Sequence, residues 1–430
     1  MIMNRLTQYN IFLLDERAFG YHYGYLVYLP LVDYVVRCNS EEIQELQSAV
    51  NGAIKPLSDK IRSILNKLKV EYRNVYRKAN DSSELSNLMI LPNSICNFNC
   101  IYCYSASGRS NVEISLNTLK CGLRWFLSPE RLVGRKATIS VLGGGEPLLS
   151  WHILKPALEY AFQLNCQRNI PLPVSLVTNG SIISEDIKQF CLQNKISLSV
   201  SFDILEDVQN YQRGSYPIVL RNINTFAEYG VDVAINCVIT KDNVGRMCEM
   251  IESMMRKLPK VKKVSFKPII SNSYFNSVEE RREYYRTFVD NFFLAQEMAD
   301  NSGIWLTSPY NNVSMCISDR YCPGKFVITP TGTISVCHCV SSPKETNYEK
   351  FIYGKINERE DTVEIDENRL SNILSYDMDY NERCVDCLAK FHCAGGCYAD
   401  ACVMTEQEHS AYCESMRYFL YKYLRKKHNI

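Results

Sequence analysis

Three cysteines within eight residues offer the first recognisable chemistry in this sequence. Cys96, Cys100 and Cys103 stand in the run Cys-Asn-Phe-Asn-Cys-Ile-Tyr-Cys. Three thiolates can hold three irons of a 4Fe-4S cube and leave the fourth iron open to bind and activate a ligand, whereas four thiolates would close the cluster. For these three residues alone, a zinc knuckle or a chance cluster is the alternative interpretation.

The C-terminal part is richer still, because ten of the 19 cysteines fall between Cys316 and Cys413. Their pattern reads Cys322-x9-Gly332-x4-Cys337, then Cys384-x2-Cys387-x5-Cys393-x3-Cys397, and then Cys413. Chance explains this spacing poorly. A pair of zinc sites is the alternative to iron–sulfur clusters, since two cysteines separated by two residues form an ordinary zinc half-site. Either metal would stabilise a region with little core of its own.

A glycine-rich stretch is the third candidate. It reads Gly143-Gly144-Gly145-Glu146-Pro147. Glycines let the backbone approach a ligand closely, and the proline favours the start of a helix. A tight turn without a ligand would explain the stretch as well if it stood alone.

Short apolar stretches that alternate with helical patterns are expected to position these groups. The strands are predicted at residues 89–95, 137–142, 174–178, 196–202, 233–240 and 264–270, and the helices at 115–127, 150–164, 184–194, 217–229, 243–258 and 278–300. This alternation predicts an α/β fold of parallel strands with right-handed crossovers, in which six units form a partial (β/α)6 barrel. The three-cysteine run and the glycine-rich stretch each follow a predicted strand, where a barrel places its functional loops. The strand at 196–202 alternates with serine, unlike a strand buried on both faces.

The composition limits where the chain works and what it binds. Its 48 Lys and Arg residues balance 47 Asp and Glu residues without charge blocks, so nucleic acid is not expected as a partner. The apolar runs are shorter than the roughly 20 residues of a membrane span, so no membrane is expected. Arg5, Gln8 and Asn10 interrupt the place of a secretion signal, and we expect a cytoplasmic protein. Cytoplasmic thiols stay reduced, so metal binding explains 19 cysteines better than disulfides do.

Together, the cysteine motif and the glycine-rich loop resemble the radical S-adenosylmethionine (radical SAM) superfamily over residues 88–309. The resemblance implies that Cys96, Cys100 and Cys103 hold a SAM-binding 4Fe-4S cluster. It also implies that Tyr102 lies beside the adenine and that Gly143, Gly144, Gly145 and Glu146 meet the amino group of the SAM methionine. The implied chemistry is one-electron: a reduced cluster cleaves SAM, and a 5′-deoxyadenosyl radical takes a hydrogen atom from the substrate.

Further matches extend the implied SAM site. Ser201 and Asp203 match a Ser-x-Asp stretch near the ribose, and Arg213 matches an arginine that contacts SAM. Asn179 belongs to a Thr-Asn-Gly turn that is common in these barrels, although a capping or turn role explains it equally well.

The C-terminal cysteines resemble the SPASM domain, an auxiliary-cluster extension of radical SAM enzymes that modify peptides and proteins. The family pattern implies one auxiliary 4Fe-4S cluster on Cys316, Cys322, Cys337 and Cys397 and a second on Cys384, Cys387, Cys393 and Cys413, which gives three clusters in all. His338 stands where anaerobic sulfatase-maturating enzymes carry an aspartate base. It is our candidate for a catalytic proton-transfer residue, with a supporting or solvated histidine as the alternative.

These matches divide the chain into a small α+β N-terminal unit at 1–85, the radical SAM partial barrel at 86–309 and the SPASM domain at 310–430. The N-terminal unit shows β-like stretches at 9–14, 25–29 and 33–38 and helices at 41–50 and 57–70, the first capped by Ser40. This order is similar to the winged-helix elements that bind leader peptides in enzymes that mature ribosomally made peptides. A lobe that only packs is the alternative.

The expected function is therefore a radical SAM/SPASM peptide maturase that installs a crosslink or another modification in a ribosomally made precursor peptide. Its expected partners are a precursor peptide with a leader sequence and an external electron donor such as flavodoxin or ferredoxin. A sulfatase-type maturase that oxidises a cysteine or serine of a protein is the second interpretation. A non-catalytic iron–sulfur protein is the third.

Overall fold

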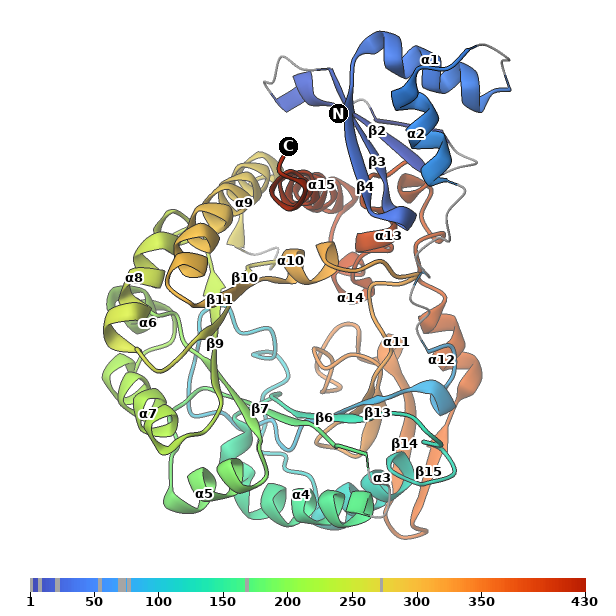
Figure 1. Cartoon of the computed structure of the whole chain (residues 1–430). Helices are drawn as coiled ribbons and strands as arrows, with labels where there is room; N and C mark the ends of the chain where they lie inside the picture. Colours follow the sequence, from blue (N-terminus) through green and yellow to red (C-terminus); the bar gives the residue numbers. More distant parts are fainter. Residues whose placement is uncertain are drawn as a thin grey trace.

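The computed structural model describes residues 3–6, 10–19, 24–52, 56–68, 75, 79–166, 170–270 and 274–430 (Figure 1). Its strands form two sheets: one of four strands near the N-terminus, and one of eleven in the order β11-β10-β9-β8-β7-β6-β5-β12-β13-β14-β15. Among the described residues, no helix combines the length and the apolar character that crossing a membrane requires.

Six βα units form the centre of the larger sheet. They are β5 (Asn87–Ile90), α3 (Leu116–Phe126), β6 (Thr138–Val141), α4 (Trp151–Asn165), β7 (Val174–Thr178), α5 (Glu185–Gln193), β8 (Ser197–Ser201), α6 (Glu206–Gln212), α7 (Tyr216–Tyr229), β9 (Val233–Ile239), α8 (Met247–Lys257), β10 (Lys263–Pro268) and α9 (Val278–Asn301). Neighbouring strands from β5 to β10 are parallel, and the helices lie around the outside of the curved sheet (Figure 1). The predicted α/β fold with a partial six-unit barrel is confirmed.

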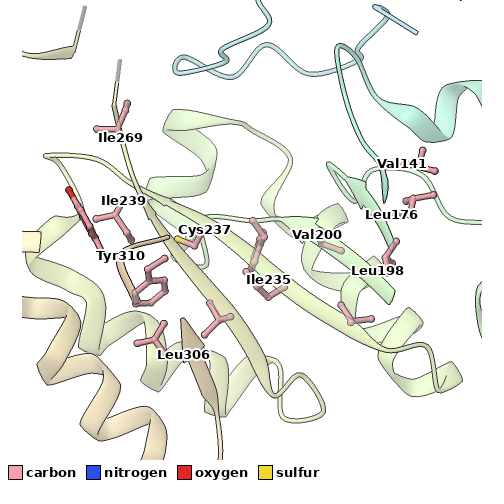
Figure 2. Packing of buried hydrophobic residues seen from close by; sticks show 14 of the residues in the cluster. Val141, Leu176, Leu198, Val200, Ile235, Cys237, Ile239, Ile269, Leu306 and Tyr310 are labelled. Atoms are coloured by element: carbon pink, nitrogen blue, oxygen red, sulfur yellow. The ribbon is translucent and has the colours of Figure 1, made fainter. Parts of the chain in front are cut away.

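The central strands are apolar on their outer face and mixed in character on their inner face. Leu198, Val200 and Ile235 are buried in the cluster that joins strands to helices (Figure 2). On the other face of β8, Ser199 and Ser201 are only half-buried. The serine alternation in this strand therefore reflects an inner face that water reaches, because successive side chains of a strand point to opposite faces.

The sheet continues beyond the six units at both edges. β11 (Trp305–Thr307) lies parallel to β10, and on the other side β12 (Phe326–Ile328) lies parallel to β5. An antiparallel run follows, made of β13 (Thr333–Ser335), β14 (Ile352–Asn357) and β15 (Thr362–Ile365). The remaining helices are α10 (Pro309–Ser314), α11 (Tyr348–Phe351), α12 (Glu367–Leu374), α13 (Lys390–Cys393), α14 (Tyr398–Ala401) and α15 (Glu406–His428). The cysteine-rich part of the chain thus extends the same sheet.

The strand that leads to the three cysteines is shorter than predicted. β5 ends at Ile90, whereas the apolar run predicted a strand to residue 95. Pro92 has no N–H to continue the ladder, so the chain leaves the sheet there. The backbone N–H of Leu91 still donates to the Ile328 carbonyl of β12 at 2.9 Å.

The N-terminal sheet precedes two helices. Its elements are β1 (Met3–Leu6), β2 (Ile11–Asp15), β3 (Tyr25–Leu29), β4 (Tyr34–Cys38), α1 (Ser40–Val50) and α2 (Asp59–Lys67), with antiparallel strands in the order β1-β2-β3-β4. The N-cap of α1 is Asn39 and not Ser40, because Asn39 and Glu42 exchange side-chain and backbone hydrogen bonds in a capping box. Of the predicted elements, Tyr9 and residues 69–70 lie outside the described residues.

Both faces of this sheet are buried. Leu13 and Val27 belong to the cluster formed with α1 and α2, while Phe12 and Tyr28 on the opposite face belong to the main core. The Tyr28 hydroxyl lies 2.7 Å from His392 Nε2, and the two rings stack with centroids 6.0 Å apart. His392, which stands among the C-terminal cysteines, therefore faces the N-terminal sheet.

A buried carboxylate strengthens this contact. Glu16 has no solvent exposure, accepts from Arg37 Nε at 2.9 Å and accepts from the Tyr421 hydroxyl of α15 at 2.9 Å. The ion pair and the hydrogen bond together join the N-terminal sheet to the last helix.

Replacement of Glu16 by Ala should loosen the N-terminal sheet. The variant leaves the Arg37 guanidinium and the Tyr421 hydroxyl without their acceptor, at a cost of about 2 kcal/mol because Arg37 is partly solvated. Hydrogen exchange of β2–β4, compared with β7–β9 as an internal reference, measures the effect. Glu16→Gln keeps an acceptor and should lose less protection than Glu16→Ala; equal protection in wild type and Glu16→Ala would contradict this account.

Candidate active site

The three cysteines lie on the loop after β5, at the carboxyl edge of the parallel strands. All three are half-buried free thiols. Donors approach two of the sulfurs: the Phe98 N–H lies 3.5 Å from Cys96 Sγ, and Arg109 Nη2 lies 3.4 Å from Cys103 Sγ. Burial raises the pKa of Cys100, and the charges of Cys103 and Cys96 add to the rise. The three thiols are therefore close to one another and have donors that stabilise thiolates, as a metal cluster requires.

The glycine-rich loop after β6 packs directly on the cysteine loop. A Cβ on Gly145 would clash with the Ile95 carbonyl, and one on Gly144 would stand 3.0 Å from the Asn93 carbonyl. The Glu146 N–H donates to the Ile95 carbonyl at 2.7 Å. Glycine is required here because side chains would push the two loops apart.

The carboxylate of Glu146 joins the glycine-rich loop to a third loop, after β7. It is buried and accepts from the Thr178 hydroxyl at 2.6 Å, from the Asn179 N–H at 2.7 Å and from the Leu148 N–H at 3.0 Å. Burial raises its pKa, and these hydrogen bonds oppose the rise. Glu146, which the resemblance assigns to the SAM amino group, thus directs its carboxylate oxygens to partners within the protein.

Asn93 is a residue of this network that sequence reasoning missed. It is fully buried, and its amide donates to the Glu146 carbonyl at 3.0 Å and to Ser150 Oγ at 2.5 Å. Its oxygen accepts from the Ile95 N–H at 3.0 Å. The signal available in the sequence was an asparagine just before the cysteine motif. The prediction of a strand through residue 95 obscured it.

Asn179 reaches the cysteine loop as well. Its side-chain amide donates to Asn97 Oδ1 at 2.8 Å and lies 4.0 Å from Cys96 Sγ, while its oxygen accepts from the Ser181 N–H at 2.9 Å. The turn role and the proximity to the cysteines therefore coexist in one side chain.

Tyr102, Asp203 and Arg213 form a compact group beside the cysteine loop. The Tyr102 hydroxyl donates to Asp203 Oδ2 at 2.6 Å and accepts from Arg213 Nη1 at 2.9 Å. Burial raises the pKa of Tyr102 well above its usual value, and the nearby Asp203 charge adds to the effect. Four residues are expected beside the adenine, near the ribose or in contact with SAM, and these three of them meet. The fourth, Ser201, lies on the inner face of β8.

A second aromatic residue of the cysteine loop, missed from sequence, connects the barrel to the C-terminal part. The Tyr104 hydroxyl donates to the Gly143 carbonyl at 3.4 Å, and its ring meets His338 edge to face at 6.2 Å. His338 Nδ1 lies 3.3 Å from Lys325 Nζ. Burial lowers the pKa of His338 well below its usual value, and Lys325 and Lys267 lower it further. The imidazole therefore lies beside Tyr104, which contacts the glycine-rich loop, in a positively charged surrounding.

The C-terminal cysteines gather in two groups. Burial, followed by the charges of Cys413, Cys387 and Cys384, raises the pKa of Cys393, so these three thiols lie within electrostatic range of Cys393. Burial raises the pKa of Cys397, to which Asp400 and then Cys337 and Cys322 contribute. Sets of reduced sulfur ligands of this kind suit iron–sulfur clusters or zinc.

Cys316 is expected to share a cluster with Cys322, Cys337 and Cys397. It is exposed just after the end of α10. Its thiol lies 3.7 Å from the Asn312 carbonyl. Cys339, by contrast, lies next to the group, since the ligand atoms of Cys337, His338 and Cys339 are within 4.8 Å of one another. Seven of the eight expected auxiliary ligands thus lie within electrostatic range of Cys393 or Cys397 of their own expected set, or are one of those two residues.

Comparisons with known proteins agree with this arrangement. The family model described as the Radical SAM superfamily matches residues 90–254. The cysteine-type anaerobic sulfatase-maturating enzyme of Clostridium novyi is 24% identical over 342 residues, covering 73% of this chain and 87% of that enzyme. The solved structure of native anSMEcpe with bound AdoMet has a TM-score of 0.64 and 20% identity over 80% of this chain and 99% of that one. Streptococcus suis SuiB bound to precursor peptide SuiA has a TM-score of 0.55 and 16% identity over 90% of this chain and 95% of that one. The motif, the fold and the family match identify residues 90–254 as a radical SAM domain and this protein as a radical SAM enzyme.

Proposed function

We propose that this enzyme is a maturase that cleaves SAM and removes a hydrogen atom from a ribosomally made precursor peptide. The observation that carries the proposal is the meeting of three loops, after β5, β6 and β7, above the inner face of the barrel. A SAM-ligated 4Fe-4S cluster, when bound, supplies a 5′-deoxyadenosyl radical at this place. The protein's part is to hold the cofactors, orient the substrate and exclude water and oxygen.

The cofactor roles follow from the contacts. In our proposal, Cys96, Cys100 and Cys103 hold the SAM-binding cluster, and Gly143, Gly144 and Gly145 bring backbone close enough to meet the methionine part of SAM. Glu146 acts as a positioning residue, because its carboxylate joins the glycine-rich loop to the loop after β7, while its backbone contacts the cysteine loop. Tyr102, Asp203 and Arg213 form the wall for the nucleoside part, with Ser201 beside them and Asn179 at the cysteine loop.

The two C-terminal groups of thiols are proposed to hold auxiliary clusters. One set is Cys384, Cys387, Cys393 and Cys413, and the other is Cys322, Cys337 and Cys397 with Cys316. Cys316 is exposed, so the loop after α10 has to move for its thiol to reach the other three. Electrons for the reaction are proposed to come from an external donor such as flavodoxin or ferredoxin.

Two observations favour a peptide over a folded sulfatase as the substrate. The likeness to SuiB, solved with its precursor peptide, covers 90% of this chain against 80% for anSMEcpe, and the chain has an N-terminal sheet packed on the cysteine-rich part. His338 stands in place of the aspartate base expected of sulfatase maturases. We propose that His338, in contact with Tyr104, takes or passes the proton that leaves the substrate.

A sulfatase-type maturase is the second candidate. It is supported by the identity with the sulfatase-maturating enzyme over 87% of that enzyme's length and by the higher TM-score of anSMEcpe. Both candidates share the SAM chemistry and differ in the substrate.

Removal of the first cysteine group tests the cofactor assignment. After anaerobic reconstitution, wild type should hold about twelve irons, as three 4Fe-4S clusters. Replacement of Cys96, Cys100 and Cys103 by Ala should leave about eight irons and abolish cleavage of SAM to 5′-deoxyadenosine. Cys166→Ala, at a thiol outside all three sets, is the control. Retained cleavage in the triple variant, or a wild-type plateau near four irons, would contradict the assignment.

The positioning role of Glu146 predicts a graded loss of SAM affinity. Glu146→Ala leaves three buried donors unpaired, at about 1–3 kcal/mol each, so the loops should separate and KM for SAM should rise about tenfold or more. Glu146→Gln keeps part of the acceptor capacity and should lose less. The iron content should stay near that of wild type in both variants. An unchanged KM in Glu146→Ala would contradict the role.

The substrate class is tested by searching the open reading frames beside the gene for one that encodes a short precursor peptide. The encoded peptide, incubated anaerobically with enzyme, SAM and reductant, should change mass while 5′-deoxyadenosine accumulates. The same peptide without its leader should react more slowly. A peptide from a neighbouring sulfatase that presents the cysteine or serine to be oxidised is the comparison substrate. Turnover of the sulfatase peptide alone would replace our proposal with the second candidate.

A further inference from the structure

A lysine on β10 stands on the inner face of the barrel at the level of the candidate site. Val264 and Phe266 are buried on the outer face of β10. Because successive side chains of a strand point to opposite faces, Lys267 points to the inside of the curved sheet. In the sheet register it pairs with Val238 of β9, whose N–H donates to the Asp203 carboxylate at 3.1 Å. Lys267 is thus one strand away from the group that we assign to the nucleoside part of SAM.

Lys267 carries a charge to which the described part of the chain supplies no carboxylate partner. Lys263, on the same face of the same strand, forms an ion pair with Asp232 at 2.7 Å. The Lys267 side chain is exposed, yet burial lowers its pKa, with Cys339 opposing the effect. An amine that is accessible to solvent and also surrounded by protein lies within the curve of the sheet, where a substrate can reach it.

Lys325, the residue just before β12, is a further cation of the C-terminal part. The neighbouring Lys325 and Lys267 both act on His338, whose pKa burial already lowers. Lys325 lies within electrostatic range of Cys322 and Cys337, which raise its pKa. Lys325 and Lys267 therefore place two positive charges within electrostatic range of His338.

Glu345 and Asp400, two carboxylates of the C-terminal part, already have partners within the protein. Glu345 accepts from the N–H groups of Ser341 at 2.6 Å and Ser342 at 3.0 Å. Asp400 is half-buried beside Cys397, whose side chain hydrogen-bonds to it. Neither is engaged with the lysine of β10. A cation in a partly desolvated interior gains most from an anionic partner that arrives with the ligand.

We propose that Lys267 binds the carboxylate of an acidic side chain of the peptide substrate and so selects peptides with Asp or Glu close to the modified residue. The proposal rests on the peptide-maturase function proposed above. The carboxylate of SAM is the less favoured partner, because Arg213 lies closer to the cysteine loop, donates to Tyr102 and acts electrostatically on Cys100.

The test uses the reconstituted full-length enzyme with SAM and three synthetic peptide libraries. Each library is a hexapeptide, acetylated and amidated, with the fourth position fixed as Glu, Gln or Lys and the others randomised without Asp, Glu, Lys or Arg. Bound peptides are quantified by affinity selection and mass spectrometry. Wild type should retain the Glu library about 10- to 100-fold better than the Gln library, the range for a hydrogen bond between charged groups. Lys267→Gln should lose this preference, and Lys267→Glu should prefer the Lys library.

Lys263→Gln is the matched control, since it removes a lysine from the same face of the same strand and should keep the preference for Glu. Iron content and far-UV circular dichroism check that each variant is folded. No preference in wild type, or an unchanged preference in Lys267→Glu, would overturn the proposal. A rise in the Kd of SAM in Lys267→Gln with unchanged peptide preference would overturn it as well and assign the lysine to SAM. Cleavage of SAM by wild type is measured in parallel, so that failure of the enzyme function itself is recognised separately.

Discussion

A carboxylate out of contact with water fixes the geometry at the mouth of this barrel. Glu146 lies between three loops and accepts from Thr178, Asn179 and Leu148. Moving one loop would leave a buried charge or a buried donor without its partner, which costs about 1–3 kcal/mol for each group. Close backbone contact between the Ile95 carbonyl and the glycine-rich loop adds a steric condition, since no side chain fits there. The cysteine loop and the glycine-rich loop therefore keep one relative position, and the proposed cofactor chemistry depends on it.

In the strands that carry these loops, the outer face contributes to stability and the inner face contributes to function. Their outer side chains form one continuous apolar core with the helices (Figure 2), while their inner side chains are partly exposed and include serines, an asparagine and lysines besides apolar residues such as Met89 and Val177. The hydrophobic effect acts on the outer face, so the inner residues are free to vary with the substrate. Lys267 on β10 and the serines of β8 belong to this inner set. The C-terminal part extends the sheet next to β5, because β12 pairs with that strand. The loop after β13 brings His338 to Tyr104.

The sequence allowed the six βα units to be predicted, since each strand is an apolar run between helical patterns, and β7 was predicted at its observed bounds. It also singled out the cysteines, because sulfur ligands are recognisable from spacing alone. It failed where tertiary contacts decide. The short strands β12–β15 exist because they pair with the edge of the sheet, which local sequence does not encode. Asn93 and Tyr104 escaped because their partners, such as Ser150 and His338, are distant in sequence. The exposure of Cys316 was likewise invisible in its spacing.

The central claim is that the three thiols of the β5 loop leave one iron open to SAM. Electron–nuclear double resonance on the reduced, reconstituted protein with SAM labelled with ¹⁵N in its amino group tests this claim most directly. A ¹⁵N hyperfine coupling is predicted, because the amino group should bind the open iron beside the glycine-rich loop. A protein that carries its clusters and binds SAM, but shows no such coupling, would contradict the account.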